Sequence, residues 1–248
     1  MEIRGTYSGT FCWVLSSKIS SSHPDFFSTF VSMKKLHALV LGATGATGQE
    51  IVKLLLEDSN FSKVSVFVRR KIDIEHEKLI IHKINFSRLS EYNNLVDGDI
   101  CFSALGTTIQ EAGGQKEQFL VDYTYQYEFA KMASENGISH YSLVSSIGAN
   151  KDSFFFYPRI KGALEESVKS LKFNKIQIFQ PPSLIRQPEL MRKGERISIK
   201  FLQGINKFGF LKSLKPLLVE ELAMKIINES LLTQTEKITT YKSKDLFN

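Results

Sequence analysis

Val40-Leu41-Gly42-Ala43-Thr44-Gly45-Ala46-Thr47-Gly48 links an apolar run at residues 36–41 to a second apolar run at residues 51–56. The first run predicts a buried parallel strand, and the second predicts a helix with one packed face. A glycine-rich turn between strand and helix lets the backbone approach a pyrophosphate, which lies against the free N–H groups at the helix N-terminus. This context predicts a dinucleotide-binding site, whereas isolated glycines would indicate only a tight turn.

Strand and helix patterns alternate along the rest of the chain. Strands are expected at residues 64–68, 79–84, 99–105, 140–145 and 176–179, and helices at residues 119–136 and 157–171. Such alternation predicts an α/β fold, a Rossmann-like doubly wound parallel sheet with right-handed crossovers. The short region at residues 183–215 predicts only a small C-terminal substrate lobe.

Residues 1–32 are rich in serine and aromatic residues and show no clear periodicity, and Met33 stands just before the first strand. We therefore expect residues 1–32 to be an N-terminal extension outside the fold and residues 33–248 to form the dinucleotide-binding domain. The extension would be an artificial appendage or the product of an upstream start codon. A targeting peptide is the alternative, but such peptides are basic and acid-poor, whereas Arg4 and Lys18 are balanced by Glu2 and Asp25.

Composition narrows the class of protein. A hydrophobic fraction of 42% supports a real core, and the net charge of +6 is too mild to indicate a nucleic-acid partner. Cys12 and Cys101 make no disulfide or metal pattern, which suits a reducing compartment, so we expect a cytoplasmic protein. The histidines lack metal-ligand spacing, and no apolar run reaches the ~18 residues of a membrane span.

The second expected strand ends in Arg69-Arg70-Lys71. Enzymes that use NAD usually place Asp or Glu there to bind the adenosine ribose, whereas an arginine binds the 2′-phosphate of NADP. The basic residues therefore predict NADP(H) as the cofactor, the alternative being an ordinary basic surface cluster.

Tyr157 and Lys161 are four residues apart, so on a helix they share one face. Ser145 and Ser146 close the fifth expected strand, at the carboxyl edge where ligands bind in such sheets. These residues predict a Ser-Tyr-Lys site. Tyrosine has a free pKa near ~10, which a neighbouring lysine cation would lower. Tyr157 would then give a proton to a carbonyl oxygen as hydride arrives, a serine would hold that oxygen, and Lys161 would also bind the nicotinamide ribose.

The chain resembles the atypical short-chain dehydrogenase/reductases, and within them the Tat-interacting-protein oxidoreductases and their small bacterial and fungal relatives. The matching residues are Val40–Gly45, Arg69-Arg70, Leu105–Thr108, Ala112–Gly114, Val144–Ala149, Tyr157, Lys161-Gly162 and Glu165. The resemblance runs from about Met33 to the C-terminus.

The resemblance implies a role for each matched residue. Gly42, Gly45 and Gly48, with Thr44, Ala46 and Thr47 between them, would form the phosphate turn, Arg69 or Arg70 would bind NADP, and Leu105, Gly106 and Thr107 would lie along the cofactor. Ser146 is the first choice for the serine and Ser145 the alternate, and Pro181 would pass the nicotinamide. Asn85 and Phe86 stand where many members place an adenine-binding Asp, and Asp122 stands where extended relatives carry Asn, which puts a proton relay at that position in doubt.

We therefore expect an NADPH-dependent reductase of an unidentified carbonyl compound. One alternative is an NADPH-binding regulator of a protein partner without turnover, which the resemblance permits. Another is a nucleotide-sugar epimerase or dehydratase, although the short C-terminal region leaves little chain to hold so large a substrate. The sequence gives neither the substrate nor the oligomeric state.

Overall fold

The computed structural model describes residues 34–186, 215–233 and 235–247, and the described residues from Lys35 onward belong to one compact unit. A seven-stranded sheet has the order β3-β2-β1-β4-β5-β6-β9, and every pair in it is parallel. Its strands are β1 (Leu36–Leu41), β2 (Phe61–Val68), β3 (Leu79–Lys83), β4 (Ile100–Ser103), β5 (His140–Val144), β6 (Lys175–Gln180) and β9 (Ile238–Lys242). The predicted Rossmann-like doubly wound fold is confirmed. The expected lobe at residues 183–215 falls mostly on residues 187–214, which lie outside the described residues.

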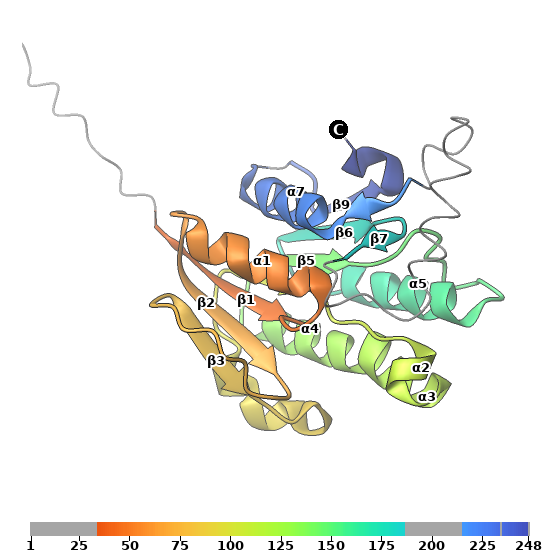
Figure 1. Ribbon diagram of the computed structural model, residues 1–248, viewed down its shortest axis with the longest axis horizontal. Helices are drawn as coiled ribbons and strands as arrows, with labels where there is room; N and C mark the ends of the chain where they lie inside the picture. The colour runs from red at the N-terminus through yellow and green to blue at the C-terminus, as the bar shows by residue number, and fades with distance from the viewer. Residues whose placement is uncertain (1–33, 187–214, 234, 248) are drawn as a thin grey trace, which may run out of the picture. The chain divides into compact units, whose positions relative to one another are not determined.

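Helices cover both faces of this sheet (Figure 1). The helical segments are α1 (Ala46–Glu57), η1 (Phe86–Leu95), α2 (Ile109–Ala112), α3 (Gln115–Phe119), η2 (Leu120–Thr124), α4 (Tyr125–Glu135), α5 (Phe156–Lys169), α7 (Val219–Leu231) and η5 (Ser243–Leu246). Ile51 and Leu55 of α1 join Leu222 and Ile226 of α7 in the core of one face. The core of the other face includes residues of α4 and α5. A separate parallel pair joins β7 (Leu184–Ile185) to β8 (Leu217–Leu218).

Chain order reverses its direction across the sheet at β1. The chain runs outward from β1 to β2 and β3, then returns to β4 on the other side of β1. In open parallel sheets such a reversal leaves a crevice at the carboxyl ends of the strands, and ligands bind there. The turn after Leu41, the loop after Ser103 and the loop after Val144 all begin at this edge.

Candidate cofactor and active site

The turn after β1 depends on two close backbone approaches. Gly42 has a positive φ of +89°, and a β-carbon there would lie 2.5 Å from the backbone N of Leu105. A β-carbon on Gly48 would lie 2.1 Å from the carbonyl oxygen of Gly42. Gly45 is different, because its nearest neighbour would be the same oxygen at 3.4 Å, an ordinary contact. The close backbone packing of the turn therefore requires glycine at Gly42 and Gly48. At Gly45 a side chain would fit the fold, and its absence leaves the exposed surface of the turn open to a ligand.

The N-terminus of α1 carries the groups that suit a pyrophosphate. Gly45 is the N-cap of α1 and supplies no side-chain cap hydrogen bond. The first N–H groups of a helix lack partners within it, and the helix dipole adds positive potential at that end. The turn and helix together fit the phosphates of a dinucleotide.

A cleft of about 120 Å³ opens where this turn meets the ends of β4 and β5. The predicted residues that line it are Gly45, Ala46, Thr47, Leu105, Gly106, Thr107, Ser145, Tyr157 and Lys161. Ala104, Val144, Leu184 and Arg186 complete its wall. The fold thus brings the expected cofactor turn and the expected catalytic pair to one place.

A second cavity, of about 250 Å³, adjoins the cleft, and Thr107 lines both. Arg69 lies in its wall, together with Glu111, Ala112, Glu117, Leu120, Val121 and Tyr125. Both arginines are exposed, but Arg70 does not line this cavity. The residues that line the two hollows extend from Arg69, at the end of β2, to Tyr157 on α5, which suits the length of a dinucleotide.

Tyr157 and Lys161 lie one turn apart near the start of α5. Tyr157 is 39% exposed, whereas Lys161 is 2% exposed and donates from Nζ to the carbonyl oxygen of Val144 at 3.2 Å. Burial lowers the pKa of Lys161, and the carboxylates of Asp122 and Glu165 oppose that shift. Lys161 is therefore a buried amine with two carboxylates nearby.

The two candidate serines have different surroundings. Ser145 is buried, lines the cleft and donates its hydroxyl hydrogen to Glu165 Oε1. Ser146 donates to the carbonyl oxygen of Ile147 at 3.3 Å and does not line the cleft. The geometry thus places the alternate serine, rather than the first choice, beside Tyr157 and Lys161.

Asn85, Phe86 and Pro181, which were predicted to touch the cofactor, line neither the cleft nor the Arg69 cavity. The Asn85 side chain caps η1 by accepting the Ser87 N–H at 3.0 Å. Phe86 is buried and packs against Tyr125, with ring centroids 5.6 Å apart. The carbonyl oxygen of Pro181 accepts the N–H of Ile147 at 2.9 Å. Their roles toward the cofactor stay predictions.

Glu165 and Gln180 belong to the site, although neither residue was assigned a role in it from the sequence. The Gln180 side-chain amide donates to both oxygens of Glu165 at 3.0 Å. Glu165 stands four residues after Lys161, so helical spacing alone would have put it beside the lysine. Asp122, noted from the sequence only as a departure, is fully buried in the π-helical segment η2 and accepts the Thr107 N–H at 3.2 Å.

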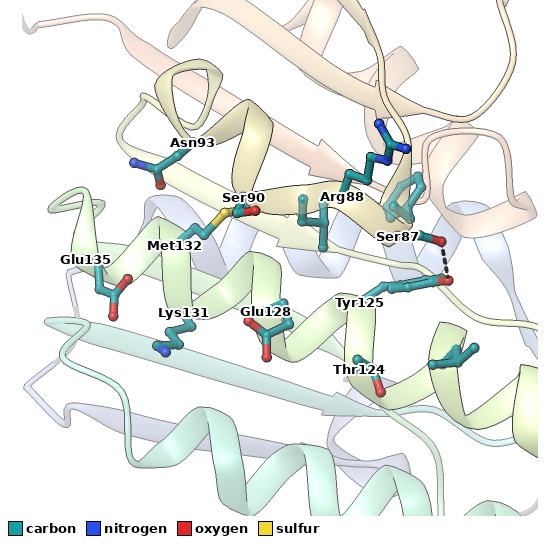
Figure 2. A pocket seen from close by; sticks show the side chains of 13 residues that line it. Ser87, Arg88, Ser90, Asn93, Thr124, Tyr125, Glu128, Lys131, Met132 and Glu135 are labelled. Atoms are coloured by element: carbon teal, nitrogen blue, oxygen red, sulfur yellow. Dashed lines mark hydrogen bonds between the residues drawn. The ribbon is translucent and has the colours of Figure 1, made fainter.

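A larger groove, of about 730 Å³, lies between η1 and α4, apart from Tyr157 and Lys161 (Figure 2). Arg88 and Ser90 project from η1, Glu128 and Lys131 from α4, and Ser87 pairs with Tyr125 across the groove at 3.3 Å. Charges of both signs surround an apolar floor, so the groove favours no one ligand chemistry.

The described residues contain no group of three or more His, Cys, Asp or Glu side chains that could hold a metal ion. Within the same residues, no helix has the length and hydropathy needed to cross a membrane.

A family model described as NAD(P)H-binding matches residues 42–173. Protein HTATIP2 of Rattus norvegicus is 36% identical over 178 residues, which cover 70% of this chain and 73% of that protein. This chain belongs to the atypical short-chain dehydrogenase/reductase family. Protein FMP52, mitochondrial, of Kluyveromyces lactis is 30% identical over 221 residues, or 85% of this chain and 97% of the relative.

Solved structures support the fold of this short-chain dehydrogenase/reductase. WbmH of Bordetella bronchiseptica in complex with NAD+ superposes with a TM-score of 0.64 at 13% identity, covering 84% of this chain and 75% of that one. UDP-glucose 4-epimerase of Thermotoga maritima with UDP-glucose gives 0.60 at 11% identity, covering 85% and 80%. At such identities the likeness concerns the fold alone.

The expectation of a cytoplasmic protein is wrong. Relatives from several yeasts, including Kluyveromyces lactis and Debaryomyces hansenii, are named mitochondrial, and they point away from the cytoplasm. The expectation failed because the number and spacing of cysteines indicate redox conditions and do not identify the compartment itself.

Proposed function

We propose that this protein is an NADP(H)-dependent oxidoreductase that reduces a carbonyl compound through Tyr157 and Lys161, with Ser145 beside them as a hydrogen-bond acceptor. The observation that carries the proposal is the composition of the cleft. One hollow is lined by Gly45 of the phosphate turn, the exposed Tyr157, the buried Lys161 and Ser145.

Each side chain has a distinct task in this proposal. The N-terminus of α1 holds the pyrophosphate, and Lys161 binds the nicotinamide ribose. The bound cofactor supplies the hydride. Tyr157 donates the proton to the carbonyl oxygen, and the Lys161 ammonium favours that transfer by stabilising the phenolate left behind.

The preference for NADP over NAD rests on Arg69. Arg69 follows the end of β2 and lines the second cavity, which shares Thr107 with the cleft. A guanidinium fork matches the geometry of a phosphate and binds it more strongly than a neutral donor would. Glu111 and Glu117 also line that cavity, and Arg69 is the cation among its described lining residues that would offset their repulsion of a phosphate.

A substrate panel tests the proposal. The purified full-length protein is first titrated with NADPH and NADH by fluorescence, and then offered aldehydes and ketones while NADPH absorbance is followed. We expect tighter binding of NADPH and turnover of at least one carbonyl compound. Tight NADPH binding without turnover of any compound would contradict the proposal and favour a regulatory protein that binds NADPH.

A further inference from the structure

Glu165 is a buried carboxylate to which the proposed reaction gives no task. It is 4% exposed and lies on α5, one turn after Lys161. Its oxygens accept the hydroxyl hydrogen of Ser145 and both contacts from the Gln180 amide. Burial of a carboxylate is costly unless hydrogen bonds replace its hydration, so these donors fix Glu165 in place beside the cleft.

The hydrogen bond to Glu165 determines whether Ser145 can donate or accept a hydrogen bond toward a ligand. A serine hydroxyl has one hydrogen to donate and two lone pairs that accept. Because that hydrogen goes to Glu165, the oxygen of Ser145 can accept from a ligand in the cleft but cannot donate to it. Donation to a carbonyl oxygen then falls to Tyr157.

Glu165 also bears on the charge of Lys161. Burial favours the neutral amine and lowers the pKa of Lys161, whereas Asp122 on η2 and Glu165 on α5 favour the ammonium ion. The other ionisable groups that line the cleft are Tyr157 on α5 and Arg186 after β7. Of the two carboxylates, Asp122 bonds to the backbone of Thr107, while Glu165 bonds to the cleft serine.

We propose that Glu165 is a positioning residue that holds the Ser145 hydroxyl group and keeps Lys161 in the charged form that binds the cofactor. The inference rests on the proposed function, which assigns Lys161 to the cofactor ribose. The single carboxylate of Glu165 would thereby act on both Ser145 and Lys161.

Titration with NADPH at a series of pH values from about 7 to about 10 tests this role without a substrate. Glu165→Gln removes the charge and keeps the shape. Loss of the Glu165 charge removes one of the two carboxylates that favour the ammonium form and so lowers the pKa of Lys161 further. NADPH affinity should therefore be lost at a lower pH than in the native protein. Lys161→Met should bind weakly at every pH and remove this pH dependence.

Glu166→Gln is the matched control. Glu166 is the next residue of α5, has a side chain 54% exposed and pairs with Lys169 at 2.8 Å, so its loss should leave the profile unchanged. Glu165→Asp keeps the charge but is one methylene shorter. It should keep the native NADPH profile and lower turnover as much as Ser145→Ala does, without adding to that variant's effect.

Two results would overturn the inference, and they distinguish a failure of the Glu165 role from a failure of the proposed function. The first is that Lys161→Met weakens NADPH binding while the pH profile of Glu165→Gln matches the native one. A pH profile of Glu165→Asp that shifts as far as that of Glu165→Gln has the same meaning. In either case Glu165 does not keep Lys161 charged. If Lys161→Met binds NADPH normally at every pH, the assignment of Lys161 in the proposed function fails as well. Melting temperatures of all variants show whether each is folded.

Discussion

At Gly48 an added β-carbon would lie 2.1 Å from a backbone oxygen, whereas at Gly45 the nearest atom would be 3.4 Å away. Gly48→Ala should therefore destabilise the fold by an overpacking cost of about 1–3 kcal/mol. Gly45→Ala should leave the melting temperature nearly unchanged and weaken NADPH binding, because the methyl group would occupy the place of the pyrophosphate. Thermal unfolding and NADPH titration of both variants check this. Equal losses of stability would contradict the distinction.

The choice between Ser145 and Ser146 shows how far single residues can be predicted. Ser145 continues the ladder of β5, since its N–H donates to the carbonyl oxygen of Phe179 at 2.7 Å. The sequence shows that a strand ends near two serines, but not which one faces the cleft. Glu165 follows from helical spacing, yet its partner Gln180 comes from another strand, which only the paired sheet brings close.

At the scale of one element, the end of β2 carries two arginines that differ in their position relative to the cavity beside the cleft. Arg69 lines the cavity that continues the cleft, and Arg70 does not. Loss of a charge-assisted hydrogen bond costs about 1.5–3 kcal/mol, so Arg69→Ser should weaken NADPH binding by roughly tenfold or more and leave NADH binding unchanged. Arg70→Ser should have a smaller effect. Fluorescence titration decides this, and equal native affinities for NADPH and NADH would contradict the account.

The helix expected at residues 119–136 is instead three successive helical segments. The π-helical η2, Leu120–Thr124, lies between α3 and α4 and carries the buried Asp122. Apolar periodicity identifies a helix but does not show a single wider turn within it. π-Helical turns are often found at functional sites, and here one places a carboxylate near Lys161.

At the scale of the whole molecule, alternating apolar runs were enough to predict six strands and the parallel sheet. The seventh strand, β9, was not predicted, because Ile238-Thr239-Thr240-Tyr241-Lys242 is short, largely polar and lies at the sheet edge. Its strand conformation depends on pairing with β6, a tertiary contact with residues about 60 positions earlier.

Residues 1–32 lie outside the described residues, so their predicted independence from the fold is open to a direct test. A chain that begins at Met33 should keep its melting temperature and NADPH affinity, because the turn, Tyr157 and Lys161 all lie in the unit that starts at Lys35. Calorimetry and NADPH titration of the full-length and truncated chains check this. A fall of several degrees together with lost binding would show that the segment packs on the domain.

The central claim is that this cleft performs chemistry as well as binding the cofactor, and Tyr157→Phe tests it most directly. The change removes one hydroxyl group from a residue that is 39% exposed, so stability and NADPH affinity should be kept. General acid catalysis contributes about 10²–10⁴-fold, so the rate of NADPH oxidation with a reactive carbonyl compound should fall by at least two orders of magnitude. A variant that binds NADPH normally and retains the full native rate would contradict the mechanism.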